Sequence, residues 1–228
     1  MGHPAKFTPA ILDVLRHYIE AFRLPVHDPF AGTGERLGRL CDELGVPFSG
    51  TEIEREFIVD PRVWPGDSTD RYSYPVYLHR PYHESFMIVT SPVYPNGMTD
   101  HQRWKSDSKW KWNTYRHGLA RITGKDRPLH MNNMGRYGNR HRRSRASEER
   151  HWGIARQCVK WWPNLAIVNV KDVVATSYTV PVVDCWVAIL RSFNYTIDEI
   201  VDVSAPGNRE GANRDLRADH EAVIVARR

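Results

Sequence analysis

The stretch "VHDPFAGTGERLGRLCDELG", residues 26–45, carries the pattern that decides the fold. A short apolar run ends in Asp28, a turn containing Gly32 and Gly34 follows, and apolar residues then recur at helical spacing. Glycine lets the backbone turn tightly between two elements and approach a ligand closely. The pattern therefore predicts a buried strand, a ligand-facing turn and a helix, in that order.

The rest of the chain continues this alternation. Strands that alternate with helices predict an α/β fold with a mostly parallel sheet and helices on both faces, and ligands in such folds bind outside the carboxyl ends of the strands. The segment 180–193 is assigned as a helix because it is longer than a typical strand, although it is rich in β-branched residues. The last two strands are expected to pair antiparallel. Helices are expected over residues 9–22, 34–45, 147–162 and 180–193, and strands over 24–30, 46–53, 64–70, 85–92, 164–172, 195–205 and 220–228.

Length and composition indicate a soluble globular protein. The chain has 228 residues, enough for one sizeable α/β domain, with 41% hydrophobic and 26% charged residues. No run of about 18 apolar residues predicts a membrane span, and the first residues lack the apolar centre of a signal peptide. The widely spaced Cys41, Cys158 and Cys185 are expected to be reduced core thiols of a cytoplasmic protein. The protein is expected to be a monomer or a homodimer.

Positive charge is concentrated in one segment. Residues 101–150 hold 14 Lys and Arg against 4 Asp and Glu, a net charge of +10, whereas the whole chain carries +5, so the remainder sums to −5. Basic and aromatic side chains together suit phosphates and unstacked bases. A solvated basic loop without a ligand is the alternative. The aromatic residues of this segment include Trp104, Trp110, Trp112, Tyr115 and Tyr137.

Three predicted strand ends carry candidate binding residues. The glycine turn lacks the third glycine of a dinucleotide fingerprint because Leu37 occupies that position, so pyrophosphate binding is disfavoured. Glu52, about twenty residues beyond the glycines, can accept both hydrogen bonds of a ribose diol. Asp67 in "GDS" can accept a hydrogen bond from an adenine amino group. Taken singly, the glycine turn is equally compatible with a structural strand–helix turn, and Glu52 with an exposed acid at a strand end. For Asp67 alone, an ordinary turn is the stronger reading.

Together with "TSPVY" at residues 90–94, these features occur in a familiar order. The chain resembles the S-adenosylmethionine-dependent DNA methyltransferases that act on exocyclic amino groups of adenine or cytosine, and is similar to compact methylases of bacteriophages and actinobacteria. "DPFAGTG" matches the family's cofactor motif, "SPVY" its catalytic turn, and "GHPAKFTPAIL" its N-terminal cofactor segment. The resemblance covers residues 3–100 by specific motifs and 164–228 only by the order of elements.

The resemblance implies a Rossmann-like class I methyltransferase fold, with a seven-stranded sheet whose last strand is antiparallel, and S-adenosylmethionine as cofactor. It also implies roles for individual residues. The catalytic residues would be Ser91, Pro92 and Tyr94. The cofactor-binding residues would be His3, Phe7, Asp28, Phe30, Ala31, Gly32, Gly34, Glu52, Asp67 and Ser68. The residues beside the substrate would include Val93 and Asn96.

The catalytic turn has a physical rationale. An aromatic amine is a poor nucleophile because its lone pair is delocalised, and two acceptors aimed at its N–H groups favour a tetrahedral nitrogen. By resemblance, these acceptors are the Ser91 hydroxyl and the Pro92 carbonyl, and Tyr94 stacks on a base turned out of the duplex. Val93 replaces the family's usual second proline, a loss of about 0.4–1 kcal/mol of preorganisation. Pro95 partly compensates by biasing Tyr94 toward an extended backbone.

Residues 97–150 are expected to form an insert that contacts double-stranded DNA, within a single methyltransferase domain spanning residues 1–228. Its arginines suit phosphates and paired contacts with guanine. A zinc site is not expected, because the histidines of the insert are irregularly spaced and no cysteine lies near them. Asn169 and Asp172 either border the pocket or cap a helix. The candidate DNA contacts are Arg116, Arg136, Arg140, Arg142 and Arg143.

Several readings stay open at this point. Serine in the first motif position slightly favours cytosine N4 over adenine N6 as the target. Cytosine C5 methylation is not expected, because no cysteine lies in a Pro-Cys turn. A methyltransferase for RNA or protein shares the fold and the cofactor motifs. A catalytically silent cofactor-binding module that binds DNA is the third reading.

Overall fold

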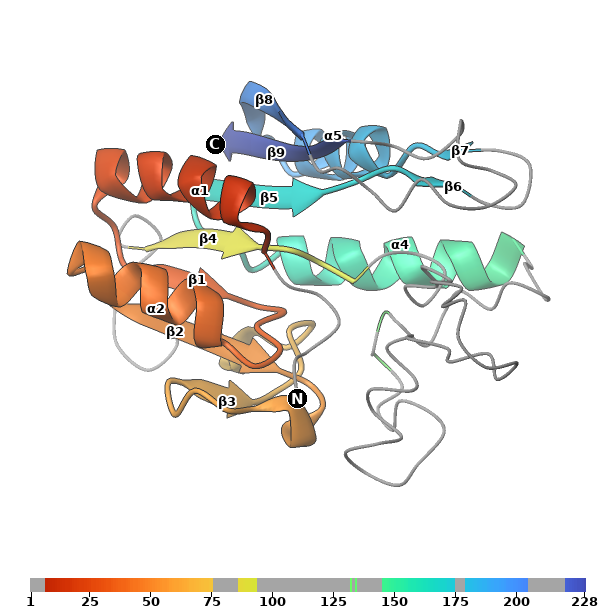
Figure 1. Cartoon of the computed structure of the whole chain (residues 1–228). Coiled ribbons are helices and arrows are strands. Elements are labelled where there is room, and N and C mark those ends of the chain that lie inside the picture. Colours follow the sequence, from red (N-terminus) through yellow and green to blue (C-terminus); the bar gives the residue numbers. More distant parts are fainter. Residues whose placement is uncertain are drawn as a thin grey trace, which may run out of the picture.

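The computed structural model describes residues 7–75, 86–93, 132, 134, 145–174, 179–204 and 220–228. Its main sheet has seven strands in the order β3-β2-β1-β4-β5-β9-β8 (Figure 1). The strands are β1 (Val26–Asp28), β2 (Phe48–Glu52), β3 (Val63–Pro65), β4 (Met87–Thr90), β5 (Leu165–Val170), β8 (Thr196–Ser204) and β9 (His220–Arg227).

The first five strands run parallel, and β9 lies antiparallel between β5 and β8. The predicted α/β fold with an antiparallel last strand is thereby confirmed. The chain builds β1, β2 and β3 outward, then returns to place β4 on the other side of β1. This reversal of strand order opens a crevice at the carboxyl ends of β1 and β4, which is where ligands bind in open α/β sheets.

Helices cover both faces of the sheet. The helices α1 (Pro9–Phe22) and α2 (Glu35–Leu44) lie on one face, and α4 (Arg145–Val159) and α5 (Val182–Ser192) lie on the other (Figure 1). The segment assigned as a helix despite its β-branched residues is indeed α5. Its buried residues recur at helical spacing, and this periodicity decides the element. They are Val182, Trp186, Ile189 and Leu190.

Local sequence signals set the helix ends near the site. The Thr8 hydroxyl accepts the Ile11 N–H and caps α1, and Pro9 takes the first helical position, where its missing N–H costs nothing. Gly34 and Gly45 bound α2, both in the left-handed region that favours glycine. The start of α2 is thereby fixed beside the glycine turn.

The structure adds elements that the sequence did not predict. A short antiparallel pair, β6 (Val173–Val174) with β7 (Thr179–Val180), precedes α5. Single 3-10 turns, η1 (Arg55–Phe57) and η2 (Arg71–Ser73), follow β2 and β3. The cysteines of the chain are free, two of them buried, as expected, and Cys185 is half-buried. No described helix is both long enough and apolar enough to cross a membrane.

Candidate active site

The carboxyl ends of β1 and β4 are joined by a buried acid. The Thr90 hydroxyl donates to Asp28 Oδ1 at 2.6 Å, and the Phe30 N–H donates to the same oxygen at 3.0 Å. Burial raises the pKa of Asp28 to about 7, although both hydrogen bonds oppose this shift. Asp28 therefore ties the tips of two neighbouring strands together at the crevice and starts the glycine turn.

The glycine turn, residues 29–34, requires its glycines. Gly32 and Gly34 have φ values of +57° and +71°, in the left-handed region. A Cβ atom on Gly34 would lie 2.5 Å from Val63 Cγ2, because β3 packs directly beneath the turn. The Gly32 N–H points to the next strand and donates to Glu52 Oε2 at 2.9 Å. The turn is thus held in shape by the strands on its own side of the crevice.

Glu52 ends β2 as a buried carboxylate with one backbone donor on each oxygen. Gly32 donates to Oε2, and the Glu54 N–H donates to Oε1 at 2.8 Å. Its side chain is only 6% exposed, and burial raises its pKa to about 7. A carboxylate offers about four lone-pair sites, so each oxygen can accept one further donor. Two adjacent hydroxyl groups of a ligand match this demand.

A first hollow lies beside Glu52. Its walls are mostly apolar, with polar groups at the ends of β2 and β3. This combination of apolar walls with a few placed polar groups is typical of small-molecule sites. The lining residues are Pro29, Phe30, Glu52, Ile53, Asp67, Ser68, Thr69, Ser91, Val93, Asn132, Met134, Ile154 and Cys158.

Asp67 and Ser68 line the first hollow, but both already form hydrogen bonds within the protein. Asp67 Oδ1 accepts the N–H and hydroxyl of Thr69 at 2.9 and 2.8 Å, and Asp67 Oδ2 accepts the Asn132 amide at 2.7 Å. The Ser68 hydroxyl donates to the Pro29 carbonyl and fastens the loop after β3 to the glycine turn. Asp67 and Ser68 thus shape the wall as well as facing the hollow.

A second hollow lies on the other side of Phe30. Ser91 and Phe30 line both hollows, so the two spaces meet at the tip of β4. Ser91 is half-buried. The lining residues are Phe7, Asp28, Phe30, Ala31, Thr33, Gly34, Glu35, Arg36, Leu37 and Ser91.

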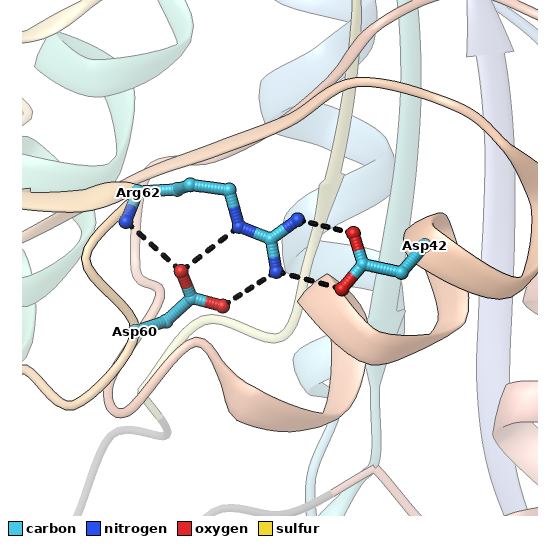
Figure 2. A network of polar contacts seen from close by, with 3 residues as sticks. All are labelled: Asp42, Asp60 and Arg62. Carbon is cyan, nitrogen blue, oxygen red and sulfur yellow. Dashed lines mark hydrogen bonds and ion pairs between the residues drawn. The ribbon is translucent and has the colours of Figure 1, made fainter.

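An ion-pair network supports the glycine turn from behind (Figure 2). The Arg62 guanidinium donates to both oxygens of Asp42 at 2.5 and 3.1 Å and to both oxygens of Asp60 at 2.9 and 2.7 Å. The pKa of Asp60 is lowered chiefly by its hydrogen bond from Arg62. The Asp60 N–H in turn donates to the Thr33 carbonyl at 3.0 Å, inside the turn. Helix α2, the β2–β3 connection and the turn are thereby locked together.

Gly38 makes room for this network. A Cβ atom there would lie 2.6 Å from Asp60 Oδ2 and 2.8 Å from Arg62 Nη2. In dinucleotide fingerprints the third glycine allows close packing of the helix. Here Gly38, one position later, allows the same close packing of α2, against the β2–β3 connection. The sequence motif alone did not reveal this role of Gly38.

The structure brings one group of predicted site residues together and leaves another group outside its description. Around the two hollows lie Phe7, Asp28, Phe30, Ala31, Gly34, Glu52, Asp67, Ser68, Ser91 and Val93. Gly32 belongs to the turn between them, and Pro92 is buried directly after Ser91. Outside the described residues lie His3, Tyr94, Asn96, Arg116, Arg136, Arg140, Arg142 and Arg143.

Sequence reasoning missed several wall residues. Ile53 directly follows Glu52, and this position alone could have predicted that it lines the hollow. Thr90 belongs to the catalytic-turn string, but nothing in the sequence indicated its bond to Asp28. Ile154 and Cys158 reach the hollow only because α4 packs there. Asp172 accepts the Val183 N–H at 3.0 Å, as the helix-cap reading expected.

Asn169 lies on β5, next to β4, without lining either hollow. It pairs with β9, and its amide donates to Glu221 at 3.0 Å. Among the described residues, no group of three or more His, Cys, Asp or Glu side chains is placed to hold a metal ion.

Comparison with solved structures identifies the fold. A crystal structure of the methyltransferase domain of bacterial CtHen1-CN superposes with a TM-score of 0.52 at 9% identity, over 98% of this chain and all of that one (100%). The chain has the fold of the class I methyltransferases. The sequence itself matches no family model and no curated protein at a significant level.

Two further methyltransferase structures are similar at lower scores. A methyltransferase from Archaeoglobus fulgidus, described as SAM-dependent, has a TM-score of 0.49 at 14% identity, over 96% of this chain and 93% of that one. Magnesium protoporphyrin IX methyltransferase from Synechocystis, with bound SAM, also has a TM-score of 0.49, at 12% identity, over 95% of this chain and 77% of that one. The methyltransferase fold therefore rests on the first comparison and on the strand order of the sheet.

Proposed function

We propose that this protein transfers a methyl group from S-adenosylmethionine to an exocyclic amino group of a base in DNA, with cytosine N4 slightly favoured over adenine N6. The observation that carries the proposal is the position of Ser91. The Ser91 hydroxyl, the first after β4, lies where the two hollows meet, and Ser91 lines the second hollow together with Asp28 and Gly34. With the cofactor across both hollows, its sulfonium would lie at this junction, where the target amine has to approach.

The site residues fit the cofactor in three respects. Glu52 has one acceptor site left on each oxygen for the ribose diol. The first hollow has apolar walls, among them Ile53, that suit an adenine ring, with Asp67 at its edge. The second hollow, between the glycine turn and Phe7, offers the buried Asp28 carboxylate to the amino-acid end. When bound, S-adenosylmethionine supplies an electrophilic methyl group on a sulfonium.

The protein's own contribution is alignment and hydrogen bonding. The Ser91 hydroxyl and the Pro92 carbonyl accept the two N–H groups of the target amine, so that its lone pair points toward the junction. These acceptors interact most strongly as positive charge develops on the nitrogen. The burial of Pro92 and the strand pairing of β4 fix the backbone that presents them, so little reorganisation accompanies the reaction.

DNA is proposed as the substrate because of the basic segment, residues 97–150. This segment follows the catalytic strand directly, and residues 101–150 carry a net charge of +10 on a chain that is acidic elsewhere. Such charge favours phosphate contacts with strong salt dependence. The order of motifs shared with amino-directed DNA methyltransferases supports the same substrate. Reversing the charge of Arg140, Arg142 and Arg143 is expected to weaken DNA binding and flatten its salt dependence.

The test is incubation with cofactor tritiated on the methyl group and with duplex DNA, total RNA and a protein extract in separate reactions. Label in DNA that is lost in Tyr94→Ala, while cofactor binding by calorimetry is kept, supports the proposal. Tyr72→Ala is the matched control, because Tyr72 is an exposed tyrosine (66%) outside both hollows. Label confined to RNA or protein would assign another substrate, and cofactor binding without transfer would assign a silent module.

A further inference from the structure

One buried polar atom lacks a partner beside the proposed catalytic turn. Asn169 on β5 is only 2% exposed, and its side-chain oxygen Oδ1 has no hydrogen-bond partner in the part of the chain that the structure describes. We infer that Asn169 is a positioning residue, whose Oδ1 accepts the Ser91 hydroxyl hydrogen and so turns the lone pairs of the Ser91 oxygen toward the target amine. The inference rests on the proposed function, in which Ser91 accepts an amine N–H.

The pairing of β4 with β5 brings Ser91 next to Asn169. The parallel register ends with Thr90 opposite Val168, and the next residues along the two segments are Ser91 and Asn169. Neighbouring strands lie about 4.8 Å apart, so adjacent side chains on one face of a sheet touch each other. The Ser91 hydroxyl and the Asn169 amide are therefore neighbours if they share a face.

Both side chains belong to the face covered by α1 and α2. Two residues earlier on each strand, Val89 and Ile167 pack in the core cluster of this face. Side chains alternate between the faces along a strand, so the alternation places Asn169 on the same face. Ser91 agrees with this placement, since it lines the second hollow together with Leu37 of the same cluster.

Glu221 on β9 sets the orientation of the Asn169 amide. The Asn169 Nδ2 group donates to Glu221 Oε2 at 3.0 Å. A carboxylate only accepts, so the amide nitrogen has to face Glu221. This bond leaves Oδ1 on the side away from β9, where β4 lies.

The Ser91 hydroxyl is the donor that fits this oxygen. Leaving a buried acceptor unpaired destabilises a fold, and such atoms are rare. Of the two sheet neighbours of Asn169, Val223 on β9 is apolar, whereas Ser91 carries a hydroxyl. Hydrogen bonds of catalytic groups are often long at first and tighten only in the reacting complex, which is the behaviour that we infer for the bond from Ser91 to Asn169.

This bond matters because of what Ser91 is proposed to do. A hydroxyl has one hydrogen and two lone-pair sites. When Ser91 accepts an amine N–H, its own hydrogen has to point elsewhere, since two hydrogens aimed at each other repel. Asn169 Oδ1 takes that hydrogen, so the lone pairs of Ser91 are already directed at the amine when it arrives.

The experiment measures the steady-state rate of tritium transfer from S-adenosylmethionine to duplex DNA by the full chain. Asn169→Leu keeps the branched shape of the side chain and removes Oδ1. Its kcat is expected to fall about tenfold, as for the loss of about one hydrogen bond, while the KM for the cofactor is unchanged. Asn164→Leu is the matched control, because it removes an amide just before the opposite end of β5, and it should keep the wild-type kcat.

A double-mutant cycle separates positioning from a general loss of structure. In a Ser91→Ala chain, where the hydroxyl is missing, Asn169→Leu should lower kcat no further. A merely structural role would lower kcat by the same factor in both backgrounds. Glu221→Leu provides a second variant should Asn169→Leu not fold: it releases the amide, so it should also lower kcat in the wild type and not in Ser91→Ala.

The outcomes distinguish this inference from the proposed function. A wild-type kcat in Asn169→Leu, or in Glu221→Leu if that variant has to replace it, would overturn the inference and leave the proposed function standing. An equal loss in the Ser91→Ala background would do the same. A wild type that binds the cofactor but labels no DNA would overturn both.

Discussion

The buried carboxylate of Glu52 makes a quantitative prediction about cofactor affinity and pH. Burial raises its pKa to about 7 in the ligand-free protein. Both oxygens must accept the ribose hydroxyls, and a protonated carboxyl carries an O–H in place of one acceptor. Binding therefore favours the ionised form, and affinity falls as the pH drops through the pKa.

The size of the effect follows from this pKa. If only ionised Glu52 binds, the apparent Kd rises by a factor of about ten between pH 8 and pH 6, or about 1.4 kcal/mol. Calorimetric titration with S-adenosylhomocysteine across this range measures the slope directly. Glu52→Gln should bind more weakly, because its amide N–H₂ must face a backbone N–H of Gly32 or Glu54. Its affinity should depend less steeply on pH, with the remaining dependence due to Asp28.

Asp28 provides the control for this titration. Its pKa is also about 7, and its charge helps to raise that of Glu52. In Asp28→Asn the slope should therefore persist, with its midpoint at a lower pH. A wild-type affinity that is constant from pH 6 to pH 8, or a pH dependence in Glu52→Gln as steep as in the wild type, would refute the assignment of Glu52 to the ribose.

Two further predictions concern the support of the glycine turn and are measured by urea unfolding. Gly38→Ala should destabilise the protein by about 1 kcal/mol, since overpacking against Asp60 outweighs the gain in helix propensity. Gly153→Ala is the control: a Cβ atom there meets nothing within 4 Å, so this change should stabilise the protein by about 0.5–1 kcal/mol. Equal effects of the two changes would disprove the packing argument. Arg62→Met should cost about 2 kcal/mol and weaken cofactor binding, because Asp60 (8% exposed) loses its partner. Removing Arg16 from its exposed pair with Glu43 should leave stability almost unchanged, and similar losses at both sites would contradict the proposed support.

The sequence predicted the sheet well because its strong signals are local. Apolar runs placed β4 and β5, the length of its segment placed α5, and the two glycines placed the turn between β1 and α2. The β6–β7 pair was missed because each strand has only two residues, too few for a periodic pattern.

The candidate site was only partly predictable, because its walls depend on tertiary packing. Asp28, Glu52 and Ser91 were found because each lies at the end of a strand, where the sequence pattern fixes its place. The bond of Asp67 to Asn132 joins segments 65 residues apart, and no local pattern encodes it. The same holds for Gly38, whose role follows from the position of Asp60 and Arg62 and not from the spacing of glycines.

The most direct test of the central claim is nucleoside analysis by mass spectrometry after duplex DNA has been incubated with the protein and S-adenosylmethionine. The account predicts N4-methylcytosine or N6-methyladenine, formed at a rate that falls about a hundredfold in Ser91→Ala while cofactor affinity is kept. DNA that contains neither modified base, under conditions where the cofactor binds at the Glu52 site, would contradict the account.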